Sequence, residues 1–386
     1  MHNDAAHAPN YPALTGLRGA AAVWVALHHA WQAAGSPALK VWILDPTPLL
    51  ACGYFGVDLF FVLSGFLLGA PFLDARVAGR PTPSLRSFWY RRTRRVMPAF
   101  LAQVAILSLL ALSTSGSLPL TPAQYPVYGL LLFNLQEGFP LLNPVHWSLP
   151  VEWNFYLVLP LLALCFPARG DWRHPLALAL LFALGFRAAC WYALERHGAE
   201  GLPVYRWILQ LPARIDQFVF GMAAARFIAR RPLASLPRWL GIAALPALAG
   251  LIWNAAPRGD IFGKADWPWI LWHYSALGAA LALLIAHACN PVTMVARALG
   301  SRPMIALGLV SYSLYLWHFP LLEWLAVLLP ALRPGAWNWW LSYAVTLLTL
   351  SGTSYALFEK PFHHRLRRGS QAAGSGGGKA ACAEPQ

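Results

Sequence analysis

Charged residues are scarce in this chain of 386 residues, of which they make up 11%, whereas 58% is hydrophobic. A soluble domain usually carries about a quarter charged residues. The scarcity excludes an ordinary soluble globular protein. The apolar residues also gather in stretches long enough to cross a bilayer, which takes about 20 residues per helix. We therefore predict an all-α fold, a polytopic membrane helix bundle.

Cysteine patterns and sequence repeats are also missing. The five cysteines are scattered, and none forms a C-x-x-C pair or a Cys/His pattern of the kind that binds metal. We therefore predict neither a disulfide framework nor a metal site. The first apolar stretch lacks a basic leader and a small-residue cleavage site, so we expect no cleavable signal peptide. No internal repeat is evident, which disfavours an inverted-repeat transporter.

Basic residues and tryptophan, by contrast, are abundant: the formal net charge is +14, and the chain has 19 Trp. A basic balance can indicate nucleic-acid binding. The cytoplasmic loops of membrane proteins also collect Lys and Arg, and Trp is typical of membrane interfaces. We therefore expect the lipid bilayer as a partner and no nucleic acid. Nothing in the sequence indicates an oligomeric state.

The apolar stretches predict about ten membrane-spanning helices, joined by short charged or Pro- and Gly-rich loops. One further stretch, 125–135, is short for a span, and we predict that it is a re-entrant or interfacial piece. The predicted spans are roughly 16–34, 49–71, 96–114, 147–166, 174–194, 204–228, 239–254, 267–289, 304–329 and 337–358.

The distribution of Lys and Arg orients these spans. If the N-terminus is inside, 20 of the 29 basic residues lie in inside segments and 5 in outside loops. This bias predicts that both termini are cytoplasmic. Counting 125–135 as a span would invert every later loop. We expect a flexible N-terminus (1–12), one transmembrane domain (13–364) and a disordered cytoplasmic tail (365–386).

Four ionisable side chains within the predicted spans are functional candidates, because such groups are costly in a membrane. Depth counting puts them all near the middle or outer half of the bilayer, where two imidazoles and two carboxylates can form an acid/base cluster. The alternative for each is structural: a histidine that hydrogen-bonds between helices, or an aspartate that pairs with a buried arginine. The four are His29, Asp58, Glu152 and His318.

Three further charged residues lie within the predicted spans. Arg18 lies eleven residues before His29, about 16 Å away along a helix axis, which puts Arg18 near the cytoplasmic face. Arg214 and Asp216 lie in mid-membrane. They either form a structural ion pair with each other or bind a polar ligand.

The basic run 90–98 contains two arginines on one helical face, Arg92 and Arg95, because they are three residues apart. Guanidinium groups are bidentate donors that suit phosphate recognition. We therefore predict an anion site at the cytoplasmic mouth of the bundle. For Arg91 and Arg94 we prefer the simpler interpretation that they orient the helix.

Several motifs together resemble the acyltransferase family 3 membrane proteins, which O-acylate bacterial surface sugars and some secreted small molecules. The resemblance covers roughly residues 13–364, and ARIDQFVFGMAAA adds a weaker sixth motif. The five main stretches are LTGLRGAAAVWVALHH, YFGVDLFFVLSGFLL, FWYRRTRRVMPAF, HWSLPVEWNFYLVLPL, and SYSLYLWHFP with FEKPF.

The resemblance implies a core of ten membrane helices in the bacterial inner membrane. It also implies an acyl-coenzyme A donor, usually acetyl-coenzyme A, that is used from the cytoplasm as a substrate and not as a permanently bound cofactor. The acceptor would be a hydroxyl of a carbohydrate, a glycolipid or a small metabolite. Lipopolysaccharide O-antigen, exopolysaccharide, peptidoglycan and a macrolide-like metabolite all fit this chemistry.

The resemblance also implies roles for residues. His29 would be essential for transfer, as a general base or as a transient acyl carrier. Arg92 and Arg95, aided by Arg18, would contact the phosphates of coenzyme A. Glu152 would orient His29 or bind the acceptor. A Trp-Ser-Leu-x-x-Glu motif maps to Trp147, Ser148 and Glu152.

The chain departs from the family pattern at three positions, Thr15, Trp153 and Lys360, where acids or an arginine are common. These departures affect fine tuning more than chemistry. A proton-coupled secondary transporter or exporter of a polar solute is the main competing function, since buried ionisable groups serve transport too. Such a transporter needs no acyl donor. A non-catalytic membrane scaffold would tolerate neutral replacements of Arg92, Arg95 and His29.

Overall fold

A computed structural model describes residues 11–40, 42, 45–136, 138–197, 207–229, 231–258 and 267–362. Within these ranges every regular element is helical and there is no strand, so the predicted all-α class is confirmed. Most of the predicted flexible N-terminus and the whole predicted tail (365–386) lie outside the described residues.

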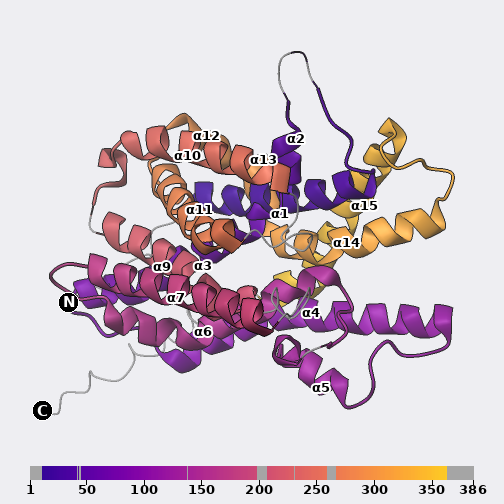
Figure 1. The fold of residues 1–386 in the computed structure, drawn as a ribbon, viewed down its shortest axis with the longest axis horizontal. Helices are drawn as coiled ribbons and strands as arrows, with labels where there is room; N and C mark the ends of the chain where they lie inside the picture. Colours follow the sequence, from indigo (N-terminus) through magenta and orange to yellow (C-terminus); the bar gives the residue numbers. More distant parts are fainter. Residues whose placement is uncertain are drawn as a thin grey trace, which may run out of the picture.

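The long helices lie roughly along the long axis of the molecule (Figure 1). Short 3₁₀ turns and one π-helix, η5 (Tyr355–Glu359), connect or end them. The α-helices are α1 Pro12–Ala33, α2 Thr47–Ala51, α3 Phe55–Val77, α4 Leu85–Ser115, α5 Gln124–Gly129, α6 Ser148–Cys165, α7 Arg173–His197, α9 Leu211–Ile228, α10 Trp239–Ala255, α11 Trp267–Ala288, α12 Met294–Leu299, α13 Arg302–Leu309, α14 Ser311–Leu328 and α15 Trp337–Ser354.

Seven of the described helices are long and apolar enough to cross a membrane, and the bent pair α13 and α14 raises the number to eight. The protein is therefore a multi-pass membrane protein. The predicted spans 16–34 and 204–228 correspond to α1 and α9, which are more polar; α9, for example, carries three charged residues. That these two helices also span, making ten, and that both termini are cytoplasmic stay predictions.

Two predicted spans differ from the helices in informative ways, and one predicted non-spanning piece agrees with them. The span 96–114 begins earlier, at Leu85, so the basic run 90–98 belongs to the same helix, α4. The span 304–329 is broken: α13 and α14 meet at an angle of 68°. The stretch 125–135 forms the short helix α5 and a 3₁₀ turn, as expected for a piece that does not span.

The helix α3 lies at the centre of the bundle, where it packs against α1, α6, α9 and α11. Its closest neighbour is α9, and glycines make the approach possible. A Cβ atom on Gly65 would lie 1.9 Å from the carbonyl oxygen of Phe218, and one on Gly221 would lie 2.0 Å from that of Val62. Small residues at such crossings are typical of membrane helices. The α3–α9 contact therefore brings the polar residues of the two helices together.

Candidate active site

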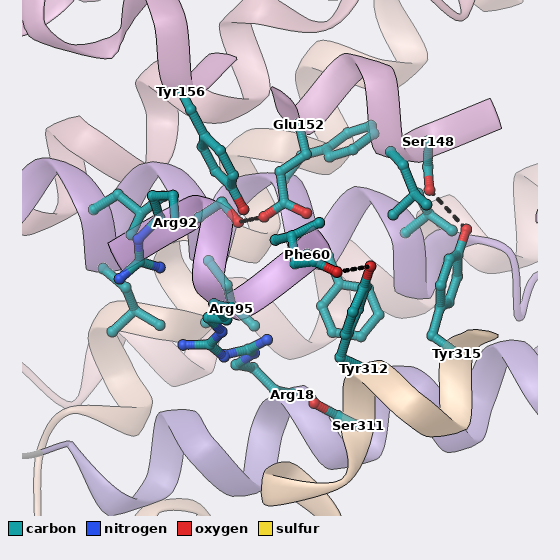
Figure 2. Close-up of a pocket in the computed structure, with 18 residues that line it drawn as sticks. Arg18, Phe60, Arg92, Arg95, Ser148, Glu152, Tyr156, Ser311, Tyr312 and Tyr315 are labelled. Carbon is teal, nitrogen blue, oxygen red and sulfur yellow. Dashed lines mark hydrogen bonds between the residues drawn. The ribbon is translucent and has the colours of Figure 1, made fainter. Parts of the chain in front are cut away.

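A cavity of about 250 Å³ opens between α1, α3, α4, α6 and α14 (Figure 2). Five separate segments of the chain supply its walls, so it exists only in the assembled bundle. Its polar lining residues are Arg18, Ser64, Arg92, Arg95, Ser148, Glu152, Tyr156, Ser311, Tyr312 and Tyr315.

Three arginines form one side of this cavity. Arg18 comes from α1, and Arg92 and Arg95 come from the shared face of α4 that the sequence predicts. Figure 2 shows their guanidinium groups on the side opposite Ser148 and Tyr315. Among the described residues, none of the three forms a salt bridge with a carboxylate. The cavity therefore carries positive charge that is available to an anion.

The other two arginines of the basic run donate hydrogen bonds to hydroxyl groups on their own helix. Arg91 donates to the Ser87 hydroxyl, and Arg94 donates to the Tyr90 hydroxyl and lies over its ring. Neither lines the cavity. The structure thus separates the run into two faces, one toward the cavity and one away from it.

Glu152 faces the same cavity from α6, one turn after Ser148. Its carboxylate accepts a hydrogen bond of 2.5 Å from the Ser64 hydroxyl of α3. Tyr156, four residues later, shares this face of α6 and also lines the cavity. No described hydrogen bond joins Glu152 to His29, so the geometry puts this carboxylate with the arginines.

Two tyrosines of α14 form the opposite wall. The Tyr315 hydroxyl lies 2.8 Å from the Ser148 hydroxyl and donates to the Val145 carbonyl at 2.9 Å. The Tyr312 hydroxyl donates to the Val96 carbonyl at 3.1 Å. Because these bonds tie α14 to α4 and to the start of α6, the tyrosine wall is held in one position.

His29 and His318 meet behind this wall and do not line the cavity. Nε2 of His318 lies 3.0 Å from Nδ1 of His29, and Nδ1 of His318 lies 2.6 Å from the carbonyl oxygen of Tyr315. The Tyr315 ring centre is 5.6 Å from that of His318. Tyr315 therefore touches both the cavity and the histidine pair. His28 turns elsewhere, with its Nδ1 2.8 Å from the Leu50 carbonyl.

The predicted cluster of four acid/base groups is not formed as one unit. His29 and His318 are in contact, Glu152 belongs to the cavity, and Asp58 lies in a separate buried network. The physical reason is that depth along the membrane normal leaves the direction around each helix open. Four groups at one depth therefore face different neighbours.

Asp58 accepts hydrogen bonds from Arg214 at 2.9 Å and from Gln217 at 2.8 Å. Asp216 instead pairs with Arg187 at 2.8 Å and accepts from Ser275 at 2.5 Å. The direct Arg214–Asp216 ion pair is therefore wrong: each residue has a partner on another helix. All of these groups are buried away from the cavity.

Trp147 precedes α6 at the end of the 3₁₀ turn η2 (Pro144–Trp147), and its ring packs edge-on against Phe61 at 6.3 Å. This contact anchors the start of α6, from which Ser148 and Glu152 project into the cavity. Trp147 itself does not line the cavity, so it supports the start of α6 from outside the site.

Sequence reasoning missed five polar lining residues: Ser64, Tyr156, Ser311, Tyr312 and Tyr315. Helical spacing contained a signal for three of them. Tyr156 is four residues after Glu152, and Tyr312 and Tyr315 are three apart, so each shares a face with another cavity residue. Within the described ranges, no group of three His, Cys, Asp or Glu side chains is placed to hold a metal ion.

Comparison with known proteins identifies a family and several relatives with similar sequences. Residues 11–358 match the family model described as an acyltransferase domain. Peptidoglycan O-acetyltransferase OatA of Listeria monocytogenes is 25% identical over 377 residues, which cover 91% of this chain and 55% of that protein. The putative peptidoglycan O-acetyltransferase YrhL of Bacillus subtilis is 27% identical over 386 residues, covering 94% and 56%.

O-acetyltransferase OatA of Staphylococcus aureus is 24% identical over 344 residues, covering 82% of this chain and 51% of that protein. The chain thus spans about half the length of the curated relatives it matches. No solved structure gives a significant match.

Proposed function

We propose that this chain, which belongs to the acyltransferase domain family, is a membrane O-acetyltransferase. It takes an acetyl group from acetyl-coenzyme A on the cytoplasmic side of the bacterial inner membrane and transfers it to a hydroxyl of a cell-surface carbohydrate. Two of its relatives carry peptidoglycan in their names, which makes peptidoglycan the first acceptor to test.

The observation that carries this proposal is the set of three arginines around one cavity. Arg18, Arg92 and Arg95 face it without carboxylate partners among the described residues. Guanidinium groups bind phosphate through paired, charge-assisted hydrogen bonds. The cavity lining has three guanidinium groups and one carboxylate, Glu152, so its positive charge is in excess. Coenzyme A is rich in phosphate and supplies negative charge that these arginines can bind.

The size of the cavity indicates how the donor lies. Small-molecule sites usually enclose roughly 300–1,000 Å³, whereas this cavity has about 250 Å³. It therefore holds part of the donor, and the rest extends to the mouth. With phosphates on the arginines, the thioester end points to the tyrosine wall, behind which His29 lies.

His29 supplies the nitrogen for transfer. As a general base, it takes the proton of the acceptor hydroxyl while the oxygen attacks the thioester carbonyl and the coenzyme A thiolate leaves. As an acyl carrier, its ring nitrogen attacks the thioester carbonyl and the coenzyme A thiolate leaves; the acceptor hydroxyl then attacks the acetyl carbon, loses its proton and frees the nitrogen. Both routes need a ring nitrogen with a free lone pair. Both also need the Tyr315 side chain to give up its hydrogen bonds to Ser148 and Val145, so that the cavity opens toward His29.

The test uses purified protein in liposomes, with labelled acetyl-coenzyme A outside and a soluble peptidoglycan oligosaccharide on both sides. We expect labelled O-acetyl product with the wild type and a loss of at least about 100-fold with His29→Ala. Leu27→Ala is the matched control, because Leu27 is exposed on the same helix. Undiminished transfer by His29→Ala would overturn the role of His29, and solute movement without consumption of acetyl-coenzyme A would establish the transporter instead.

A further inference from the structure

The histidine pair behind the tyrosine wall has a fixed direction of hydrogen bonding. Its last acceptor is the carbonyl oxygen of Tyr315, 2.6 Å from Nδ1 of His318. A carbonyl oxygen can only accept, so Nδ1 of His318 must carry a proton. A neutral imidazole has one N–H and one lone pair, which leaves Nε2 of His318 as an acceptor.

The next bond in the series follows from this. Nε2 of His318 lies 3.0 Å from Nδ1 of His29. Because Nε2 of His318 accepts, Nδ1 of His29 must donate, and the lone pair of His29 then lies on Nε2.

The surroundings keep the pair neutral. His318 is fully buried, and no described carboxylate hydrogen-bonds either ring. An imidazolium without a partner is costly in such a place. The neighbouring His28 does not compete, because its own Nδ1 points to the Leu50 carbonyl. The Phe319 ring packs edge-on against His29 at 5.3 Å and limits its rotation.

We propose that His318 is a positioning residue that holds His29 in the Nδ1–H tautomer and so presents Nε2 as the reacting nitrogen. This inference rests on the proposed function, since it assigns the state of the histidine that the transfer uses. It also links the cavity to the chemistry: Tyr315 contributes its side chain to the cavity wall and its carbonyl to the tautomer of His29. A hydrogen-bond partner of this kind sets the orientation and basicity of a catalytic histidine.

Two amide variants distinguish positioning from a merely structural role. In His318→Gln, the side-chain amide reaches the place of Nε2 and its oxygen accepts from His29. In His318→Asn, the shorter amide reaches the place of Nδ1 and keeps only the bond to the Tyr315 carbonyl. We expect kcat to fall at least about tenfold in His318→Asn and to stay within about threefold of wild type in His318→Gln. The KM for acetyl-coenzyme A should be unchanged in both, because the arginines are intact.

The experiment measures kcat and KM in the liposome assay and the unfolding temperature of each variant. An Asn variant as active as the Gln variant, or more active, overturns the inference, since it would show that the bond to Tyr315 is what matters. The proposed function fails separately, if the wild type does not consume acetyl-coenzyme A or if His29→Ala remains active.

Nitrogen NMR of histidine-labelled protein gives a second readout that needs no activity. The ring signals that disappear in His29→Ala belong to His29. We expect a protonated Nδ1 and an unprotonated Nε2, and a mixture of tautomers in His318→Asn. A protonated Nε2 in the wild type would overturn the inference even if the transfer assay behaved as expected.

Discussion

Two sets of arginines lie within this helix bundle, and their surroundings differ. Arg187 and Arg214 are almost completely buried, and each forms an ion pair with an aspartate on another helix. Arg18, Arg92 and Arg95 are partly exposed, face a cavity and have no carboxylate partner among the described residues. The difference shows how to distinguish an arginine that holds helices together from an arginine that is available to a ligand.

The energetic consequences of the two settings are opposite. A buried ion pair that loses one partner leaves an uncompensated charge, which destabilises a protein by about 3–5 kcal/mol. An arginine at a cavity wall contributes little to the fold, since water or an anion completes its hydrogen bonds. Stability should therefore depend on the first set and donor binding on the second.

The largest expected effect is on the buried pairs. Asp58→Ala leaves Arg214 without its partner and should lower the free energy of unfolding by about 3–5 kcal/mol. Thermal unfolding in detergent measures this change. The double variant Asp58→Leu with Arg214→Met is the control and should be milder, because no charge is left buried. If Asp58→Ala is as stable as the wild type, the distinction between the buried and the cavity arginines is wrong.

The next effect concerns the cavity. Arg92→Gln or Arg95→Gln removes a charge-assisted hydrogen bond worth about 1.5–3 kcal/mol, so the KM for acetyl-coenzyme A should rise about 10- to 100-fold. The unfolding temperature should stay within the error of the wild type. A variant with unchanged KM and lower stability would move these arginines into the structural set.

A smaller effect is expected at the wall between cavity and histidines. Tyr315→Phe removes the hydroxyl that lies 2.8 Å from the Ser148 hydroxyl and 2.9 Å from the Val145 carbonyl. We expect a loss of about 1 kcal/mol in stability and a kcat reduced a few-fold at constant KM. Kinetics in liposomes measures the split; a changed KM with constant kcat would place Tyr315 at the phosphate end of the donor.

The smallest effect sharpens the comparison from within the basic run. Arg91→Gln changes a residue next to Arg92 that donates only to Ser87 on its own helix. We expect a KM within about twofold of the wild type, since surface charges of this kind contribute little. A large rise in KM would show that the whole run, and not one face of α4, binds the donor.

Much of the fold was predictable because it depends on local composition. Apolar stretches predict where helices lie, and the structure confirms helices at all these places, while the boundaries move where polar residues continue a helix, as in α4. The break between α13 and α14 was not predicted, because no proline at the junction marks it in the sequence. That break puts Ser311 and Tyr312 beside the cavity.

The site was predictable in parts. The shared face of Arg92 and Arg95 follows from helical spacing, and so does the pairing of Ser148 with Glu152 on α6. The arrival of Arg18 from α1 at the same cavity does not follow from any local pattern. The tyrosine wall was missed because an aromatic residue in an apolar helix has the same pattern whether it lines a cavity or fills a core.

By itself, the amino-acid sequence determined that this protein lies in a membrane, that it is helical, and which residues share a helix face, because these depend on neighbours a few residues away. Only the tertiary structure decided the partners. Asp58 pairs with Arg214, 156 residues later, and His29 meets His318, 289 residues later. Such pairs depend on how each helix is rotated against the next, which the packing of the whole bundle sets and no single helix can specify.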